Sequence, residues 1–311
     1  KQNGQRLEAA GGPVDINNDG LITGSEASVS LNTGTVGALA NFETDNTAWS
    51  LGANYLINDD LSVFGRASSG ASFNFDRALD YGVRNSAGDL NAGGDEAYID
   101  EVNQYEVGVK WQNAPVGAGV LDRYGTLIFS DTEESNITIT PPSGQVREYE
   151  AQGIELEGYY SVGNFDLYAT TTYTDAEIVR AADAQGNVNT ALQGNTPQRQ
   201  AEWIWAISPS YTHDKFRVGG SWIGTTDSFA NDANNLTQEG YSIINVNAAY
   251  SLTDALEIGI DVNNLTDQAG ITESANDGRD GWDTNGDGLL DTTIGRSIQG
   301  RTASVRLNYT F

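Results

Sequence analysis

The chain has 311 residues, of which 43 are Asp or Glu and 16 are Lys or Arg, so the formal net charge is −27. A surface this acidic repels phosphate backbones, which excludes nucleic acid as a partner. The absence of Cys excludes disulfides, thiolate metal sites and a Cys nucleophile. No apolar run is long enough for a membrane-spanning helix, and residues 1–6 do not resemble a signal peptide. Because the chain contains no Met, we expect a fragment or a processed product.

Apolar and polar side chains alternate in many short segments, which predicts an all-β protein whose strands each have one apolar face. In chain order the apolar positions are Trp49/Leu51/Ala53/Tyr55, Leu61/Val63/Gly65/Ala67, Tyr105/Val107/Val109/Trp111, a weaker Leu127/Phe129, Ile154/Leu156/Gly158/Tyr160, Phe165/Leu167/Ala169/Thr171/Tyr173, Ala201/Trp203/Trp205/Ile207, Phe216/Val218/Gly220/Trp222, Ile244/Val246/Ala248/Tyr250/Leu252, Leu256/Ile258/Ile260/Val262 and Ala303/Val305/Leu307/Tyr309/Phe311.

The predicted connections between these strands alternate in length. Short ones span residues 57–60, 113–120, 162–164, 212–215 and 253–255, and long ones span 70–102, 134–147, 179–199, 226–239 and 267–299. Outer-membrane barrels have short periplasmic turns and long external loops, whereas a soluble β-sandwich or solenoid has no reason to place every long loop at one end. The alternation therefore favours an antiparallel transmembrane β-barrel, with residues before Ala48 and the loop 267–299 at the same end.

The residues on the two faces of the predicted strands agree with a barrel in lipid. The polar positions carry large or charged groups such as Arg66, Glu155 and Arg306, which suit a wet interior. Tyr and Trp are frequent near strand ends, where amphipathic rings fit the depth of the lipid headgroups. We therefore expect the apolar faces to contact lipid.

Three segments resemble a known family. Residues 304–311, Ser-Val-Arg-Leu-Asn-Tyr-Thr-Phe, resemble the terminal strand of bacterial outer-membrane proteins. Residues 260–267, Ile-Asp-Val-Asn-Asn-Leu-Thr-Asp, followed by Gly300-Arg301, are similar to the penultimate strand and last-strand entry of TonB-dependent receptors. Residues 51–55 and 59–70 resemble a mid-barrel hairpin of the same receptors.

The resemblance implies about 11 or 12 strands from the C-terminal half of the family's 22-stranded barrel. Residues 48–311 would be barrel, residues 1–47 an extracellular loop region, and the N-terminal plug, which contacts TonB, would be absent from this chain. The implied location is the Gram-negative outer membrane, in contact with lipid. The implied function is TonB-energised uptake of a scarce nutrient, such as a ferric siderophore or a glycan.

In this family, external loops and the plug bind the small-molecule or oligosaccharide ligand. We therefore expect ligand contacts from aromatic and Arg side chains in the long loops, although packing of the loops on themselves is an alternative role. The candidates are Phe73, Phe75, Arg77, Tyr81, Tyr98, Arg279 and Trp282.

Residues 15–26 match the twelve-residue calcium loop. Oxygen ligands occupy positions 1, 3 and 5, Gly20 permits the turn, and a carboxylate stands at position 12. The predicted Ca²⁺ ligands are Asp15, Asn17, Asp19, the Leu21 carbonyl and Glu26. A second acidic loop lacks the final Glu, because Ile294 stands there, and offers Asp283, Asn285, Asp287, Leu289 and Asp291. The alternative for both is an acidic turn without metal.

Enzyme functions are not supported. The single His, His213, falls in a predicted short turn, so a Ser-His hydrolase would lack its base. The alternative function from another class is a calcium-stabilised secreted or cell-surface adhesin or structural protein, with soluble β-structure and Asp-rich loops. Such a protein would be extracted by buffer, whereas a membrane barrel would require detergent.

Overall fold

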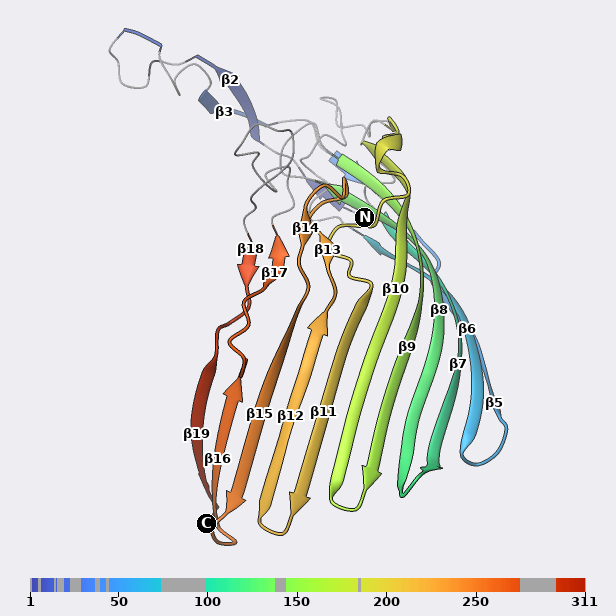
Figure 1. Cartoon of the computed structure of the whole chain (residues 1–311). Coiled ribbons are helices and arrows are strands. Elements are labelled where there is room, and N and C mark those ends of the chain that lie inside the picture. Colours follow the sequence, from blue (N-terminus) through green and yellow to red (C-terminus); the bar gives the residue numbers. More distant parts are fainter. Residues whose placement is uncertain are drawn as a thin grey trace.

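The computed structural model describes residues 2–4, 7–13, 15, 20–22, 29–36, 40–42, 45–73, 99–137, 144–183, 186–274 and 295–310. The principal element is an eleven-stranded antiparallel sheet that curves as a wall (Figure 1), with the order β19-β16-β15-β12-β11-β10-β9-β8-β7-β6-β5. Its strands are β5 (Trp49–Leu56), β6 (Leu61–Phe73), β7 (Ile99–Val116), β8 (Gly119–Ile137), β9 (Gly144–Val162), β10 (Phe165–Asp183), β11 (Trp203–His213), β12 (Phe216–Thr225), β15 (Tyr241–Ser251), β16 (Leu256–Asn263) and β19 (Thr302–Tyr309).

Smaller elements lie beyond this sheet. They are the pairs β1 (Gln2–Gly4) with β4 (Ala40–Phe42), β2 (Leu7–Gly12) with β3 (Val29–Val36), β13 (Ser228–Phe229) with β14 (Thr237–Gln238), β17 (Ile271–Ser274) with β18 (Gly295–Ser297), and the 3₁₀ turn η3 (Thr190–Leu192). The described residues of the region 1–47 thus contain four short strands, and all four lie outside the wall. Since β4 pairs with β1 and not with the wall, it adds no strand to the barrel sheet.

Each strand of the wall pairs with its neighbour in chain order, and the alternation of connections is confirmed. The short turns, residues 57–60, 117–118, 163–164, 214–215 and 252–255, lie at one end, the lower one in Figure 1. Gly117 and Gly163 have φ values of 61° and 59°, as the tight turns of two-residue hairpins require. The long connections leave from the opposite end, where β17, β18 and residues 45–48 also lie.

Four central strands are longer than the alternation predicted. The segment 113–120, expected as a connection, mostly continues β7 and β8, because an irregularity between Trp111 and Ala114 lets pairing resume. β8, the strand with the weakest alternation, runs for 19 residues between two long neighbours that pair with it. A membrane strand needs about 9–11 residues. β7 to β10 are therefore longer than a membrane strand needs to be, and at the long-loop end β9 and β10 rise beyond β11, whose pairing with β10 stops at Tyr173.

The register confirms one continuous apolar face. Ala169 on β10 opposes Ile207 on β11, Ile207 opposes Trp222 on β12, and Trp222 opposes Ile244 on β15. Side chains of this face are open to the surroundings on interior strands as well, with Val107 on β7 52% and Leu156 on β9 48% exposed. A surface of this size without cover by protein fits a face turned toward lipid.

The opposite face of the wall carries ion pairs between neighbouring strands. Arg66 on β6 lies 2.9 Å from Glu106 on β7, and Arg306 on β19 lies 3.7 Å from Asp261 on β16. Arg217 on β12 pairs with Glu257 on β16, across the intervening β15, on the same face. Charges that are paired and partly hydrated suit the interior of a barrel.

A buried corner fixes the end of β16. The Asn264 side chain is 2% exposed and donates to the carbonyls of Gln268 and Gln299, while its Oδ1 accepts the Gln268 N–H at 2.8 Å. The Asp267 carboxylate accepts the Arg301 N–H at 2.7 Å. Both residues adopt positive φ, which Asn and Asp tolerate better than most residues. The motif that resembles TonB-dependent receptors thus ties both ends of the 267–299 connection together.

No helix in the described part of the chain is long and apolar enough to span a membrane. Within the same residues the sheet is not closed, because β5 and β19 each pair with one strand only.

If one face of the wall contacts lipid and the other lines the barrel interior, the same charged side chain should destabilise the barrel more on the first face than on the second. Leu156→Arg places a cation toward lipid and should destabilise the folded barrel by about 2–4 kcal/mol. Thr170→Arg, on the other face and opposite Glu157, should cost much less. Urea unfolding in lipid vesicles measures both variants, and equal destabilisation would contradict the assignment.

Candidate functional site

The buried apolar side chains of the described residues are concentrated at the long-loop end and not within the wall. Ile178 and Ala181 near the end of β10 are fully buried, as is Val146 on β9 at 1% exposure. Ala201 and Ala230, from the connections after β10 and β12, are also buried. These connections, residues 186–202 and 226–240, therefore pack on the raised ends of β9 and β10 as a soluble protein packs around its core. We call them the loop platform.

Backbone hydrogen bonds attach the first platform loop to β10. The Ile178 N–H donates to the Asn195 carbonyl at 2.8 Å, and the Gly194 N–H donates back to the Ile178 carbonyl at 2.9 Å. The Arg199 N–H donates to the Phe229 carbonyl at 2.7 Å, which joins the two loops. Because these bonds satisfy main-chain groups next to buried side chains, they hold the loop in one conformation.

Asp232 connects the platform to the wall. Its carboxylate lies 2.9 Å from Nε of Arg147, which is 8% exposed, and accepts the Gln198 N–H at 3.1 Å. The Asp232 carbonyl accepts from the Asn195 amide at 2.8 Å. One residue thus contacts β9 and two separate points of the other loop.

A second set of charges extends the platform toward the end of the chain. Glu273 on β17 lies 3.1 Å from Arg199 and 3.0 Å from Arg296 on β18. The base of the 267–299 connection is therefore joined to the platform.

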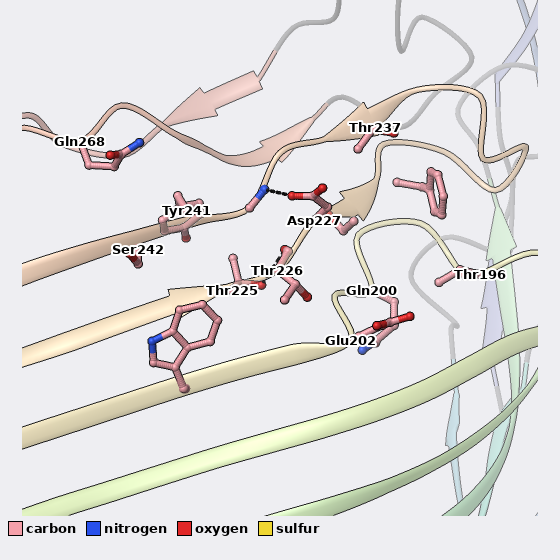
Figure 2. A pocket seen from close by; sticks show the side chains of 14 residues that line it. Thr196, Gln200, Glu202, Thr225, Thr226, Asp227, Thr237, Tyr241, Ser242 and Gln268 are labelled. Carbon is pink, nitrogen blue, oxygen red and sulfur yellow. Dashed lines mark hydrogen bonds between the residues drawn. The ribbon is translucent and has the colours of Figure 1, made fainter.

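A cavity of about 700 Å³ lies where β11, β12 and β15 meet the platform. Figure 2 shows Gln200, Glu202, Thr225, Asp227 and Tyr241 around it. The Asp227 carboxylate accepts the Gly240 N–H at 2.7 Å, which holds this acid at the rim. The described residues that line it are Thr196, Gln200, Glu202, Trp205, Thr225, Thr226, Asp227, Ser228, Phe229, Thr237, Gly240, Tyr241, Ser242 and Gln268, and these include two carboxylates and no Lys or Arg.

Sequence reasoning missed this cavity, because its residues come from three strands and three connections and share no motif. The only signal was the pair Trp203 and Trp205, which we assigned to a lipid-facing strand.

The predicted metal ligands are described in part. Asp15 and Leu21 are described, and the Asp15 carboxylate accepts the Gly20 N–H at 2.8 Å. Gly20 has φ of 82°, as the calcium-loop pattern predicts for its Gly position. Asn17, Asp19, Glu26 and the second loop, Asp283 to Asp291, lie outside the described residues. Among the described residues, no three His, Asp or Glu side chains are placed to hold a metal ion.

The predicted ligand contacts also lie largely outside the described part. Phe73 ends β6, at the long-loop end, while Phe75, Arg77, Tyr81, Tyr98, Arg279 and Trp282 are not described. His213 lies at the opposite end, as expected, beside Asn164 and Asp214 with 60% of its side chain exposed.

Comparison with known proteins agrees with this architecture. A family model described as "TonB dependent receptor-like, beta-barrel" matches residues 19–265. No curated protein matches the chain.

Similar folds occur in solved structures of uptake receptors. The ferric yersiniabactin uptake receptor of Yersinia pestis aligns with a TM-score of 0.65 and 16% identity over 91% of this chain and 40% of its own. The ferric-catecholate import receptor of E. coli K12 aligns with a TM-score of 0.61 and 17% identity, over 97% of this chain and 40% of its own. A siderophore receptor of Acinetobacter baumannii aligns with a TM-score of 0.59 and 16% identity, over 93% of this chain and 38% of its own. The chain thus spans about two fifths of the length of these receptors.

An antiparallel wall with one lipid-facing side, short turns at one end and long loops at the other defines a transmembrane β-barrel protein. The family match makes the class specific: the chain belongs to the TonB-dependent receptor barrel family. Members of this family are transport receptors, not enzymes, and are located in the outer membrane of Gram-negative bacteria with their loops extracellular.

The role of Asp232 is testable. Asp232→Ala removes the acceptor shared by Arg147 and Gln198, and breaking such a largely buried pair typically costs about 3–5 kcal/mol. We expect faster hydrogen exchange in residues 186–202 and 226–240, with the wall unchanged. Asp261→Ala, which removes the exposed 3.7 Å pair with Arg306, is the control and should cost under about 1 kcal/mol. Unchanged exchange in Asp232→Ala would contradict the role of Asp232 in holding the platform.

Proposed function

We propose that the chain forms part of the barrel of a receptor that takes up a scarce nutrient with energy supplied through TonB. The observation that carries this proposal is that the long connections leave the wall at one end, where core packing and Asp232 hold two of them in place. A fixed external surface lowers the conformational entropy lost when a ligand binds. The plug that contacts TonB would lie outside this chain.

The nutrient class is supported by fold similarity alone. The structures that resemble this chain include siderophore receptors and a copper transporter, which favours a metal chelate. An oligosaccharide is the second candidate. We propose that the aromatic and Arg side chains named above, such as Tyr81 and Trp282, contact the ligand from the long loops.

Uptake assays test this function in cells. Accumulation of ⁵⁵Fe is measured with catecholate, hydroxamate and carboxylate siderophores, and fluorescent oligosaccharides are tested in parallel. We expect one probe to accumulate in the parent strain and to fall to background when the receptor gene is deleted or TonB is inactive. Equal accumulation with and without the receptor for every probe would reject the proposal.

Single variants then test the loop contacts. Trp282→Ala should weaken uptake of the accepted probe by about tenfold, as expected for loss of an aromatic anchor. Tyr105→Ala, on the lipid-facing side of the wall, is the matched control and should leave uptake unchanged.

We also propose that residues 15–26 bind Ca²⁺ through Asp15, Asn17, Asp19, the Leu21 carbonyl and Glu26. The contact from Gly20 to Asp15 supports this proposal, because it curls the start of the loop around the first ligand. The loop at 283–291 would bind more weakly, since it lacks a Glu at its last position. Calcium would hold together carboxylates that otherwise repel one another.

Calorimetry with Ca²⁺ measures this site. Extracellular calcium modules bind at about 10⁻⁴–10⁻³ M, and Glu26→Gln should weaken or abolish binding by removing a bidentate ligand. Glu239→Gln removes an acid from another connection and should have no effect. Equal binding by Glu26→Gln and the parent would reject the site.

A further inference from the structure

The cavity beside the loop platform carries hydrogen-bonding groups that the described part of the chain does not use. No hydrogen bond or ion pair within that part engages the Glu202 carboxylate or the hydroxyls of Tyr241 and Ser242. The Asp227 carboxylate uses Oδ1 for the Gly240 N–H, and Oδ2 is left over. The cavity therefore offers several acceptors and hydroxyls to a ligand.

An aromatic ring forms one wall of the same cavity. Trp205 on β11 is opposite Gly224 on β12, and a Cβ at Gly224 would come within 2.3 Å of Cζ2 of the indole. The ring therefore lies across the backbone of β12, where only Gly leaves room for it. An edge-to-face contact with Trp222, at 5.5 Å between centroids, fixes its orientation. One side of the indole is against the sheet, and Trp205 lines the cavity.

We propose that this cavity binds a saccharide. A sugar ring has an apolar C–H face that stacks on an indole, and hydroxyls around its edge that donate to carboxylates and exchange hydrogen bonds with Ser, Thr and Gln. An anionic ligand would meet Glu202 and Asp227, with no Lys or Arg among the described lining residues. An apolar ligand would leave the same polar groups buried without partners. The volume of about 700 Å³ is within the range of small-molecule sites.

The position of the cavity allows two sources of the saccharide. Register places Trp205 on the same face as Ile207 and Trp222, which is the lipid-facing one, at the end of β11 next to the long loops. A free oligosaccharide can reach this end from outside the cell. The sugar part of an outer-leaflet glycolipid can reach the same place along the barrel wall. The inference does not rest on the proposed transport.

Binding by the full-length receptor, purified in detergent, tests the proposal. Neutral oligosaccharides of glucose, xylose and galactose are titrated by calorimetry and by tryptophan fluorescence. Glu202→Gln changes an exposed carboxylate that makes no hydrogen bond or ion pair within the described part of the chain, and it should weaken binding about tenfold, the value of one charged hydrogen bond. Trp205→Ala should abolish binding, and Trp205→Phe, which keeps an aromatic face, should retain part of it. Glu239→Gln is the charge-matched control outside the cavity lining.

A second arm tests the glycolipid source. The receptor is reconstituted in phospholipid vesicles with and without lipopolysaccharide, and bound lipid is measured by native mass spectrometry. The glycolipid source is supported if lipopolysaccharide binds, its binding is lost in Trp205→Ala and weakened in Glu202→Gln, and free oligosaccharides do not bind. The free saccharide is supported if oligosaccharides bind with the same dependence on the two variants and lipopolysaccharide does not. No binding in either arm, or equal binding by parent and both variants, overturns the proposal. Urea unfolding confirms that each variant is folded, and uptake assays report on transport separately.

Discussion

The constraint on which the whole structure depends is the need to pair every backbone N–H and C=O group that lies in lipid. In this chain each wall strand between β5 and β19 meets that need by pairing with a strand on either side. Pairing in chain order makes the strands antiparallel and places successive connections at alternate ends. It also locks the register, so that one face is apolar throughout, since a slip of one residue would turn charged side chains toward lipid. The two outer strands have the same need, which a neighbouring strand on each free edge would meet.

Different forces stabilise the wall and the loops. In the wall, side chains such as Val107 and Leu156 stay exposed, because lipid replaces a protein core. The loop end is surrounded by water and not by lipid, so apolar groups there must be buried by protein. Ile178, Val146 and Ala230 form that buried cluster, and Arg147 with Asp232 closes its edge. Substitutions should therefore separate into two groups, with lipid-facing changes affecting barrel stability and platform changes affecting the external loops.

The sequence predicted those features of the structure that depend on residues close together in the chain, and it missed those that depend on residues far apart. Strands, faces and connection parity depend on a two-residue period and on loop lengths, which are local, and they were predicted. The extensions of β7 and β8 were not, because Asn113, Pro115 and Gly117 mark a turn by composition while pairing resumes around them. The platform was missed because Arg147 and Asp232 are 85 residues apart and follow no pattern. The predicted calcium and ligand residues fall mostly outside the described part, and those proposals depend on the experiments.

Charge connects the wall, the two acidic loops and the cavity. Among the described residues seven arginines lie in ion pairs with acids, three of them on the charged face of the wall and four toward the long-loop end. Because these arginine side chains are already paired with acids, a chain of net charge −27 has a large excess of carboxylates on its surfaces. Such surfaces attract divalent cations and repel anions, more strongly at low salt. A bare anion would therefore approach poorly, whereas a neutral saccharide would not be repelled and a calcium ion would be attracted. The composition that excluded nucleic acid at the outset thus also limits the ligands that the external end can accept.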